Sequence, residues 1–565
     1  MKNSNFEKLV TPFEAALNDS PWQEYPRPQF KRDSYLNLNG KWSLSVKKRE
    51  GVLPLGEILV PFPPESRISG IERQFSKDDI IVYKRSFTLQ NDFLKDRLLL
   101  NFGAVDQTCR VFINGSFVGG HEGGYIPFTL DITDCAKDGE NEITVEVSDP
   151  LDTELPYGKQ CKKRGGMWYT PVSGIWQTVW LEAVCNDYIK SIKMTPDANK
   201  VKIEVTGGTE NKTLLFEGRE YAFGDSIEIS PESPELWSPE NPKLYCFAVV
   251  SGGDRVDSYF ALRDVKIHDD MILINGEPRF FHGLLDQGYF SDGIYLPATP
   301  EGFESDVLTM KKLGFNMLRK HIKIEPELFY YYCDKYGMFV FQDLVNSGKY
   351  NFLIDTALPT VGLKRGIAHK ASKKRREAFE TTAEQTLDLL YNHPSIVYYT
   401  LFNEGWGQYD AKRLYRKMKA ADPTRVWDAT SGWFWTDESD VLSEHIYFKP
   451  LKLKSDGRPL VLSEFGGYSY KEEGHVFNIK NTYGYKFYKD IGEFQKGLFE
   501  LYGEQVAAAI EGENLAAAVY TQVSDVEDET NGLFTYDRQC LKVDEEKMKA
   551  VSDKLYEAFA NKNKQ

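Results

Sequence analysis

The sequence has 565 residues, more than one ordinary domain holds, and this length indicates three or four folding units. Hydrophobic residues make up 41% and charged residues 27%, as in globular proteins. The formal net charge of −15 argues against nucleic acid or an anionic membrane surface as a partner.

The N-terminus and the cysteines bear on the compartment. No apolar core follows Met1, so we predict no signal peptide, and no apolar run approaches the length of a membrane span. The 7 cysteines are scattered and include no CxxC pair, which fits free thiols in a reducing compartment better than disulfides or a zinc site. We therefore expect a cytoplasmic protein, although a chain with a trimmed leader would look the same.

Residues 1–185 are predicted to form an all-β domain. Short β-patterned runs at residues 81–87, 110–113 and 142–147 alternate with turns, and Asn114-Gly115 is a strong hairpin signal. This pattern predicts a jelly-roll β-sandwich. A loop rich in glycine at residues 164–174 carries Trp168, which either packs in the sandwich core or reaches a partner domain.

Residues 186–264 contain a second group of short strands, for example at residues 201–205 and 244–250. Turn-rich segments at residues 231–234 and 239–242 separate them. The length and the strand density predict an immunoglobulin-like β-sandwich.

From residue 265 to residue 565, strand-like runs alternate with segments of helical period. We expect strands at residues 280–283, 315–319, 338–341, 396–402, 424–427, 444–447, 460–463 and 517–520. We expect helices at residues 301–313, 327–336, 373–391 and 410–421, between 487 and 511, and at 545–560. Eight strands with intervening helices predict a C-terminal (β/α)8 TIM barrel. Residues 344–370 show no clear period and are predicted to be a long loop on the active face.

Polar residues gather at the C-terminal ends of the predicted strands, where TIM barrels place catalytic groups. In strand order they are Asp286, then Arg319 and His321, then Asn403 and Glu404, then His445 and Tyr447, then Glu464, and finally Gln522. Arg319 and His321 either bind a substrate, orient a carboxylate, or form a purely structural ion pair. Trp406 either stacks on a substrate or packs under its loop.

Glu404 and Glu464 both follow strongly apolar strands and nearly face each other across the predicted barrel. Glycoside hydrolysis needs one protonated carboxyl group that donates to the leaving oxygen and one carboxylate that attacks the anomeric carbon. Asn403 could hold the sugar 2-hydroxyl. Glu404 would then need a pKa raised by burial and by the charge of Glu464.

Asn403-Glu404 after the fourth strand and Glu464 after the seventh resemble the retaining glycoside hydrolases with TIM barrels. The two β-domains ahead of the barrel narrow the resemblance to glycoside hydrolase family 2. Residues 36–42, 111–115, 121–125, 173–177 and 392–396 are also similar to that family, so the resemblance covers nearly the whole chain. It implies Glu404 as the acid/base and Glu464 as the nucleophile.

Several departures bear on the sugar. Family β-glucuronidases carry an Asn-x-Lys near the last barrel strand, and residues 528–534 lack it. Large β-galactosidases carry a metal-binding His directly after the acid/base, where Gly405-Trp406-Gly407 stands here, and an Asp where Gly166 stands. The chain resembles the compact bacterial branch of the family.

We predict a retaining exo-β-glycosidase that acts on an oligosaccharide or glycoside, with β-galactosidase-type substrates first. Alternatives are the same chemistry on a β-glucuronide, β-mannoside, galactofuranoside or arabinoside, or a carbohydrate-binding protein without catalysis. Substrate contacts are expected from Asn403, Arg319, His321, His445, Tyr447, Trp406, Asp286, Gln522 and Trp168. We expect no cofactor, and leave open an assisting Mg²⁺ or Na⁺ ion and a homo-oligomer.

Overall fold

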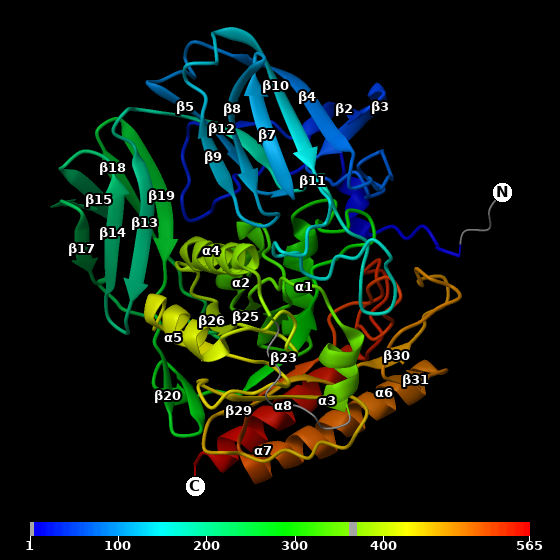
Figure 1. The fold of residues 1–565 in the computed structure, drawn as a ribbon. Coiled ribbons are helices and arrows are strands. Elements are labelled where there is room, and N and C mark those ends of the chain that lie inside the picture. The colour runs from blue at the N-terminus through cyan, green and yellow to red at the C-terminus, as the bar shows by residue number, and fades with distance from the viewer. Residues whose placement is uncertain (1–4, 361–369, 565) are drawn as a thin grey trace.

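The computed structural model describes residues 5–360 and 370–564. Two β-sandwiches pack against a C-terminal barrel, the first above it and the second to its left in Figure 1. In the part of the chain that is described, no helix is both long and apolar enough to cross a membrane.

The first sandwich contains a six-stranded sheet in the order β3-β2-β4-β10-β7-β8 and a four-stranded sheet in the order β1-β12-β5-β9. Alternation of buried and exposed residues, as along β2, turns one face of each sheet toward a shared core. The predicted hairpin at Asn114-Gly115 is confirmed, since both residues have positive φ, 51° and 83°, between β7 and β8. The elements are η1 (Pro12–Ala16), β1 (Leu36–Asn37), β2 (Gly40–Lys48), β3 (Gly51–Val60), β4 (Ile80–Leu89), β5 (Arg97–Phe102), β6 (Val105–Asp106), β7 (Thr108–Ile113), β8 (Ser116–Glu122), β9 (Phe128–Asp131), β10 (Gly139–Ser148), β11 (Gly174–Ile175) and β12 (Val179–Val184).

The second sandwich pairs a three-stranded sheet, β13-β14-β17, with a four-stranded sheet, β16-β15-β18-β19. All strand pairs are antiparallel, and one apolar cluster fills the space between the sheets. The immunoglobulin-like prediction is therefore confirmed. The strands are β13 (Ile189–Pro196), β14 (Val201–Gly207), β15 (Lys212–Phe216), β16 (Arg219–Phe223), β17 (Ser226–Ile229), β18 (Tyr245–Ser251) and β19 (Asp254–Phe260).

The barrel is an eight-stranded parallel sheet in the order β27-β26-β25-β24-β23-β32-β29-β28, and it is nearly closed. The TIM-barrel prediction is confirmed, and each expected strand is present. The strands are β23 (Phe281–Asp286), β24 (Met317–Lys320), β25 (Phe339–Asp343), β26 (Ile396–Thr400), β27 (Val426–Asp428), β28 (Leu442–Ile446), β29 (Leu460–Phe465) and β32 (Leu515–Tyr520). A parallel pair, β30 (Tyr468–Tyr470) and β31 (Lys486–Tyr488), lies outside the barrel sheet.

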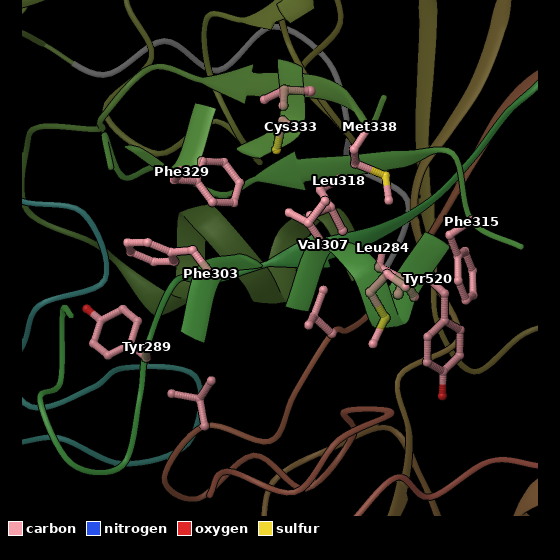
Figure 2. Close-up of a cluster of buried hydrophobic side chains, with 14 of the residues drawn as sticks. Leu284, Tyr289, Phe303, Val307, Phe315, Leu318, Phe329, Cys333, Met338 and Tyr520 are labelled. Carbon is pink, nitrogen blue, oxygen red and sulfur yellow. The ribbon is translucent and has the colours of Figure 1, made fainter. Parts of the chain in front are cut away.

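Helices cover the outer face of the barrel (Figure 1). Apolar side chains of α1 and α2 share one core cluster with those of β23 and β24, and Figure 2 shows Phe303, Val307 and Phe329 in this cluster with Leu318 and Leu284. This layer follows from the helical period predicted for both segments. The helices are α1 (Glu301–Lys312), α2 (Glu327–Tyr336), α4 (Lys373–Leu390), α5 (Ala411–Ala421), α6 (Ile491–Glu500), η3 (Leu501–Val506), α7 (Ala507–Glu513) and α8 (Glu545–Lys562).

A small antiparallel sheet precedes the first barrel strand and was not predicted. It consists of β20 (Val265–His268), β21 (Met271–Ile274) and β22 (Glu277–Pro278). Ile272 and Ile274 join the apolar cluster that contains Phe281, Met317 and Phe339 of the barrel strands. One end of the barrel interior is therefore filled by apolar side chains.

The insertion at residues 344–370, predicted to be a long loop, is partly helical. It contains η2 (Leu353–Ala357) and α3 (Leu358–Thr360), while residues 361–369 lie outside the described part. Asn351 Oδ1 accepts hydrogen bonds from the backbone N–H groups of Leu353, at 3.1 Å, and Ile354, at 3.3 Å. Such local bonds begin a helix without any apolar period, so the prediction was wrong at residues 353–360.

Candidate active site

The strand that leads to Glu404 is buried along its whole length, and the chain turns sharply after it. Glu404 itself has φ 50°, and its N–H donates to Ser431 O at 2.9 Å. Gly407 also has positive φ, and a Cβ there would lie 1.8 Å from Ser347 O. Glu404 thus occupies the left-handed region, which few non-glycine residues adopt.

Tyr447 connects the two candidate carboxylates. Its hydroxyl lies 3.1 Å from Glu404 Oε1 and 2.7 Å from Glu464 Oε2, so it can donate to either group. One oxygen of Glu404, one of Glu464 and a ring nitrogen of His445 all lie within 4.8 Å of one another. The two acidic side chains therefore share one small space.

Arg319 donates hydrogen bonds to Glu464, the candidate nucleophile, and to the side-chain amide of Asn403. Its guanidinium donates to Glu464 Oε1 at 3.1 Å, to Asn403 Oδ1 at 2.9 Å and to Asp343 Oδ1 at 3.0 Å. Because the amide oxygen of Asn403 is engaged, its NH₂ group is left as a donor. That nitrogen is buried and has no hydrogen-bond partner among the described residues.

Two histidines lie beside these groups. His445 Nδ1 lies 2.8 Å from Glu404 Oε1, and its Nε2 lies 3.0 Å from Ser431 Oγ. His321 Nδ1 lies 2.8 Å from Asp343 Oδ2, and burial lowers the pKa of His321. The neutral ring of His321 can therefore act as a hydrogen-bond partner in the site.

Burial raises the pKa of Glu404 above its ordinary value. The nearby charge of Lys159 opposes this shift more than any other group does, followed by the hydrogen bond from Tyr447. The net shift is upward, so the protonated form of Glu404 persists to higher pH than that of an exposed glutamate.

These groups line one narrow pocket. Its walls come from several barrel strand ends and from one loop of the first sandwich. The lining residues are Lys159, Met167, Leu285, Gln287, His321, Asn403, Glu404, Trp406, Tyr447, Glu464, Tyr485, Thr521 and Glu529.

The residues predicted from the sequence fall into three groups. Glu404, Glu464, Asn403, His321, Tyr447 and Trp406 line the pocket. Arg319 and His445 lie behind the carboxylates and contact them.

The remaining three do not line it. Gln522 lies on the side of Glu529 away from the pocket, and its Nε2 donates to Glu529 Oε2 at 2.8 Å. Trp168 packs on Trp406, with ring centroids 5.3 Å apart. Asp286 forms a buried ion pair with Lys320 at 2.7 Å.

Sequence reasoning missed Lys159, Gln287, Tyr485 and Glu529. Tyr485 lies in a loop and stacks on Tyr447, with ring centroids 3.9 Å apart. Glu529 follows the last barrel strand, but the chain first passes Gln522 and then returns to the pocket. Because we looked for site residues directly after each barrel strand, we predicted Gln522 and not Glu529. Lys159 lies in a loop of the first sandwich, where no periodic pattern distinguishes it.

Glu404, His445 and Glu464 also form a group that could ligate a metal ion, the one such group found among the described residues. In this arrangement, however, the ligand atoms bond to one another or to Tyr447, and Arg319 already balances Glu464. This internal pairing fits an acid/base site better than a metal centre.

Comparison with known proteins agrees with this architecture. Residues 265–553, just over half of the chain, match the family model "Glycosyl hydrolases family 2, TIM barrel domain". Residues 71–183 match "Glycosyl hydrolases family 2, sugar binding domain". The chain therefore belongs to glycosyl hydrolase family 2.

Individual relatives are more distant. A β-galactosidase of Thermoanaerobacter pseudethanolicus is 28% identical over 46% of this chain and 39% of its own length. A putative β-glucuronidase of Formosa agariphila is 25% identical over 57% and 39%. The chain thus spans about two fifths of the length of the curated relatives it matches. A solved family 2 β-galacturonidase of Eisenbergiella tayi shares the fold, with TM-score 0.70, 20% identity and coverage of 94% and 98%.

Proposed function

We propose that this chain is a retaining exo-β-glycosidase in which Glu464 is the nucleophile and Glu404 the acid/base. The observation that carries the proposal is the shared space of the two carboxylates, whose nearer oxygens lie within 4.8 Å. Retaining enzymes hold their carboxyl groups about 5–5.5 Å apart, whereas inverting enzymes leave about 6.5–9.5 Å for a water.

In the first step, Glu464 attacks the anomeric carbon while protonated Glu404 gives its proton to the leaving oxygen. The glycosidic bond breaks and a glycosyl ester forms on Glu464. In the second step, the Glu404 carboxylate takes a proton from water, the water oxygen attacks the anomeric carbon, and the ester bond breaks. Two inversions at one carbon give net retention.

Other residues of the pocket position the substrate and the catalytic groups. Asn403 offers its free N–H donor to the sugar 2-hydroxyl, a contact that strengthens in the transition state. Arg319 orients Glu464 through a hydrogen bond at 3.1 Å. Because the residues supply both the acid and the nucleophile, the reaction requires no cofactor, and we expect dialysis against a chelator to leave the rate unchanged.

The sugar is proposed to be of the β-galactoside type, a choice supported by curated relatives that are named β-galactosidases. A β-uronide is the second candidate. It is favoured by the ammonium group of Lys159 in the pocket, and by one relative named as a putative β-glucuronidase.

The test is substitution of the two carboxylates. Glu404→Ala should reduce hydrolysis of a phenyl glycoside about 10²- to 10⁴-fold, and Glu464→Ala by several orders of magnitude. With an activated aryl glycoside, added azide should give Glu464→Ala an α-glycosyl azide and Glu404→Ala a β-glycosyl azide, because azide enters from the face that each carboxylate vacates.

Glu444→Gln is the matched control, since Glu444 neighbours His445 on β28 but does not line the pocket. Each variant is first shown to be folded. Near-parental hydrolysis by Glu464→Ala or Glu404→Ala would rule out the assignment, and would leave a carbohydrate-binding barrel without this chemistry as the alternative.

A further inference from the structure

The first sandwich contributes one charged side chain to the pocket, and this side chain is Lys159. Its exposed fraction is only 6%, and its ammonium lies 4.7 Å from the ring centroid of Trp406. The structure shows no hydrogen bond or ion pair between its Nζ and any other described residue. Lys320, Lys323 and Lys542 are also buried, and each of them forms an ion pair at 2.7–2.8 Å.

The side chain of Lys159 is largely buried, while its Nζ opens to the pocket and has no acceptor from the described residues. A substrate that enters the pocket can supply that acceptor. Trp406 offers the cation a ring face but no lone pair, and therefore does not replace that acceptor.

Glu529 is the counterpart of Lys159 in the same pocket. Gln522 Nε2 donates to Glu529 Oε2 at 2.8 Å, and Gln287 Nε2 donates to Gln522 Oε1 at 2.8 Å. This chain of amides fixes the carboxyl group from behind. Burial raises the pKa of Glu529 to about 7, and Lys159 is the strongest of the groups that oppose the rise.

The charges of the pocket lining decide between a neutral and an acidic sugar. Three glutamates line the pocket, but Glu404 is the protonated acid and Arg319 pairs with Glu464. Glu529 and Lys159 are therefore the two charged lining groups left for the glycone, and a uronate would place its carboxylate beside those of Glu464 and Glu529. A neutral sugar adds none, and its hydroxyl groups can accept from an ammonium and donate to a carboxylate at once.

We propose that Lys159 and Glu529 form a specificity pair that binds hydroxyl groups of a neutral glycone and discriminates against its uronic acid counterpart. The inference rests on the proposed glycosidase activity and specifies the substrate class of that site. It assigns the recognition of the sugar jointly to the first sandwich and to the segment that follows the last barrel strand.

The test uses pairs of aryl glycosides that differ only at the carbon outside the ring. These are 4-nitrophenyl β-galactoside with β-galacturonide, and 4-nitrophenyl β-glucoside with β-glucuronide. The enzyme is expected to accept one of the two pairs, galacto or gluco, better than the other. Within that pair, the wild-type enzyme should have a higher kcat/KM for the neutral glycoside than for the uronide. Lys159→Met should lower kcat/KM for that neutral substrate about 10- to 100-fold, the usual effect of one hydrogen bond to a charged group.

Glu529→Gln gives the sharper result when the assay is run above pH 7, where Glu529 is ionised, because the substitution then removes a negative charge and keeps the shape. Its kcat/KM for the neutral substrate should fall, while the ratio of uronide to neutral kcat/KM rises at least about tenfold, as Lys159 becomes available to the substrate carboxylate. Lys163→Met and Glu473→Gln, both exposed, are the matched controls and should leave both values unchanged.

Binding to Glu464→Ala separates this proposal from the catalytic one. Titration calorimetry with galactose against galacturonate, and with glucose against glucuronate, measures selection without hydrolysis, and the neutral sugar should bind more tightly. The inference would be overturned if the enzyme preferred the uronide or the uronate and if Lys159→Met abolished this preference. The glycosidase assignment would remain intact in that case. An unchanged substrate ratio in Glu529→Gln would also overturn it.

Discussion

At the scale of single residues, the proposed mechanism needs a protonated Glu404 beside an ionised Glu464. Burial of Glu404 raises its pKa, while the guanidinium of Arg319 donates a hydrogen bond to Glu464. Tyr447 lies within hydrogen-bonding distance of both. Different surroundings thus give two identical side chains opposite roles.

The pH dependence of the rate follows from these surroundings. The acid must be protonated, so kcat/KM should fall as the pH rises through the raised pKa of Glu404. Lys159 is the strongest of the groups that lower this pKa, and its removal in Lys159→Met should move the basic limb of the profile to higher pH. Tyr447, His321 and Arg319 also face Glu404 and remain in this variant.

Initial rates across the pH range, with a phenyl glycoside as substrate, provide the measurement. Lys163→Met serves as the control of equal charge change on the same loop. A basic limb at the same pH in Lys159→Met and in the wild-type enzyme would mean that Glu404 does not control it.

The sequence identified this pair because each glutamate directly follows a buried parallel strand, and the geometry of a barrel brings such strand ends together. It did not identify Lys159 or Glu529. Lys159 belongs to another domain, and the way two domains pack leaves no periodic trace in either segment. Asp286 and Gln522 occupy strand ends like those of the glutamates, yet their side chains bond to Lys320 and Glu529.

At the scale of elements, the loop between β10 and β12 determines the upper wall of the pocket. Tyr157 N–H donates to Asn346 O at 3.0 Å on one side of Lys159. On the other side, Arg164 forms ion pairs with Glu527 at 3.2 Å and with Asp528 at 3.3 Å. The loop is therefore tied to the barrel on both sides of the residue that enters the site.

Arg164→Ala should loosen this wall. The substitution leaves Glu527 and Asp528 buried without this cation, so we expect a lower melting temperature. We also expect a higher KM, about fivefold for each kcal/mol of binding free energy lost, and a smaller change in kcat. Arg97→Ala, which removes an exposed ion pair of the same sandwich, is the control. Parental KM and melting temperature in Arg164→Ala would show that the tie is not needed.

Periodicity predicted most elements well, because each long helix packs one apolar face on the barrel sheet. It predicted α2 at the bounds observed, Glu327–Tyr336. It failed where local hydrogen bonds decide the structure, as at η2, and where short strands pair only with each other, as in the sheet of β20, β21 and β22.

At the scale of the whole molecule, the pocket is a joint product of the barrel and the first sandwich. The barrel contributes the glutamates, and the sandwich contributes Lys159 and Met167. The sequence indicated that the loop carrying Trp168 could reach a partner domain. It could not indicate which side chain of that loop enters the pocket, because that depends on the relative orientation of two separately folded units.

The stereochemistry of the first product tests the central claim most directly. Proton NMR of an aryl β-glycoside during hydrolysis by the wild-type enzyme resolves the anomer that forms before mutarotation. Double displacement through Glu464 predicts that the β-anomer appears first and the α-anomer only later. Initial release of the α-anomer would contradict the mechanism, because it requires a single displacement by water.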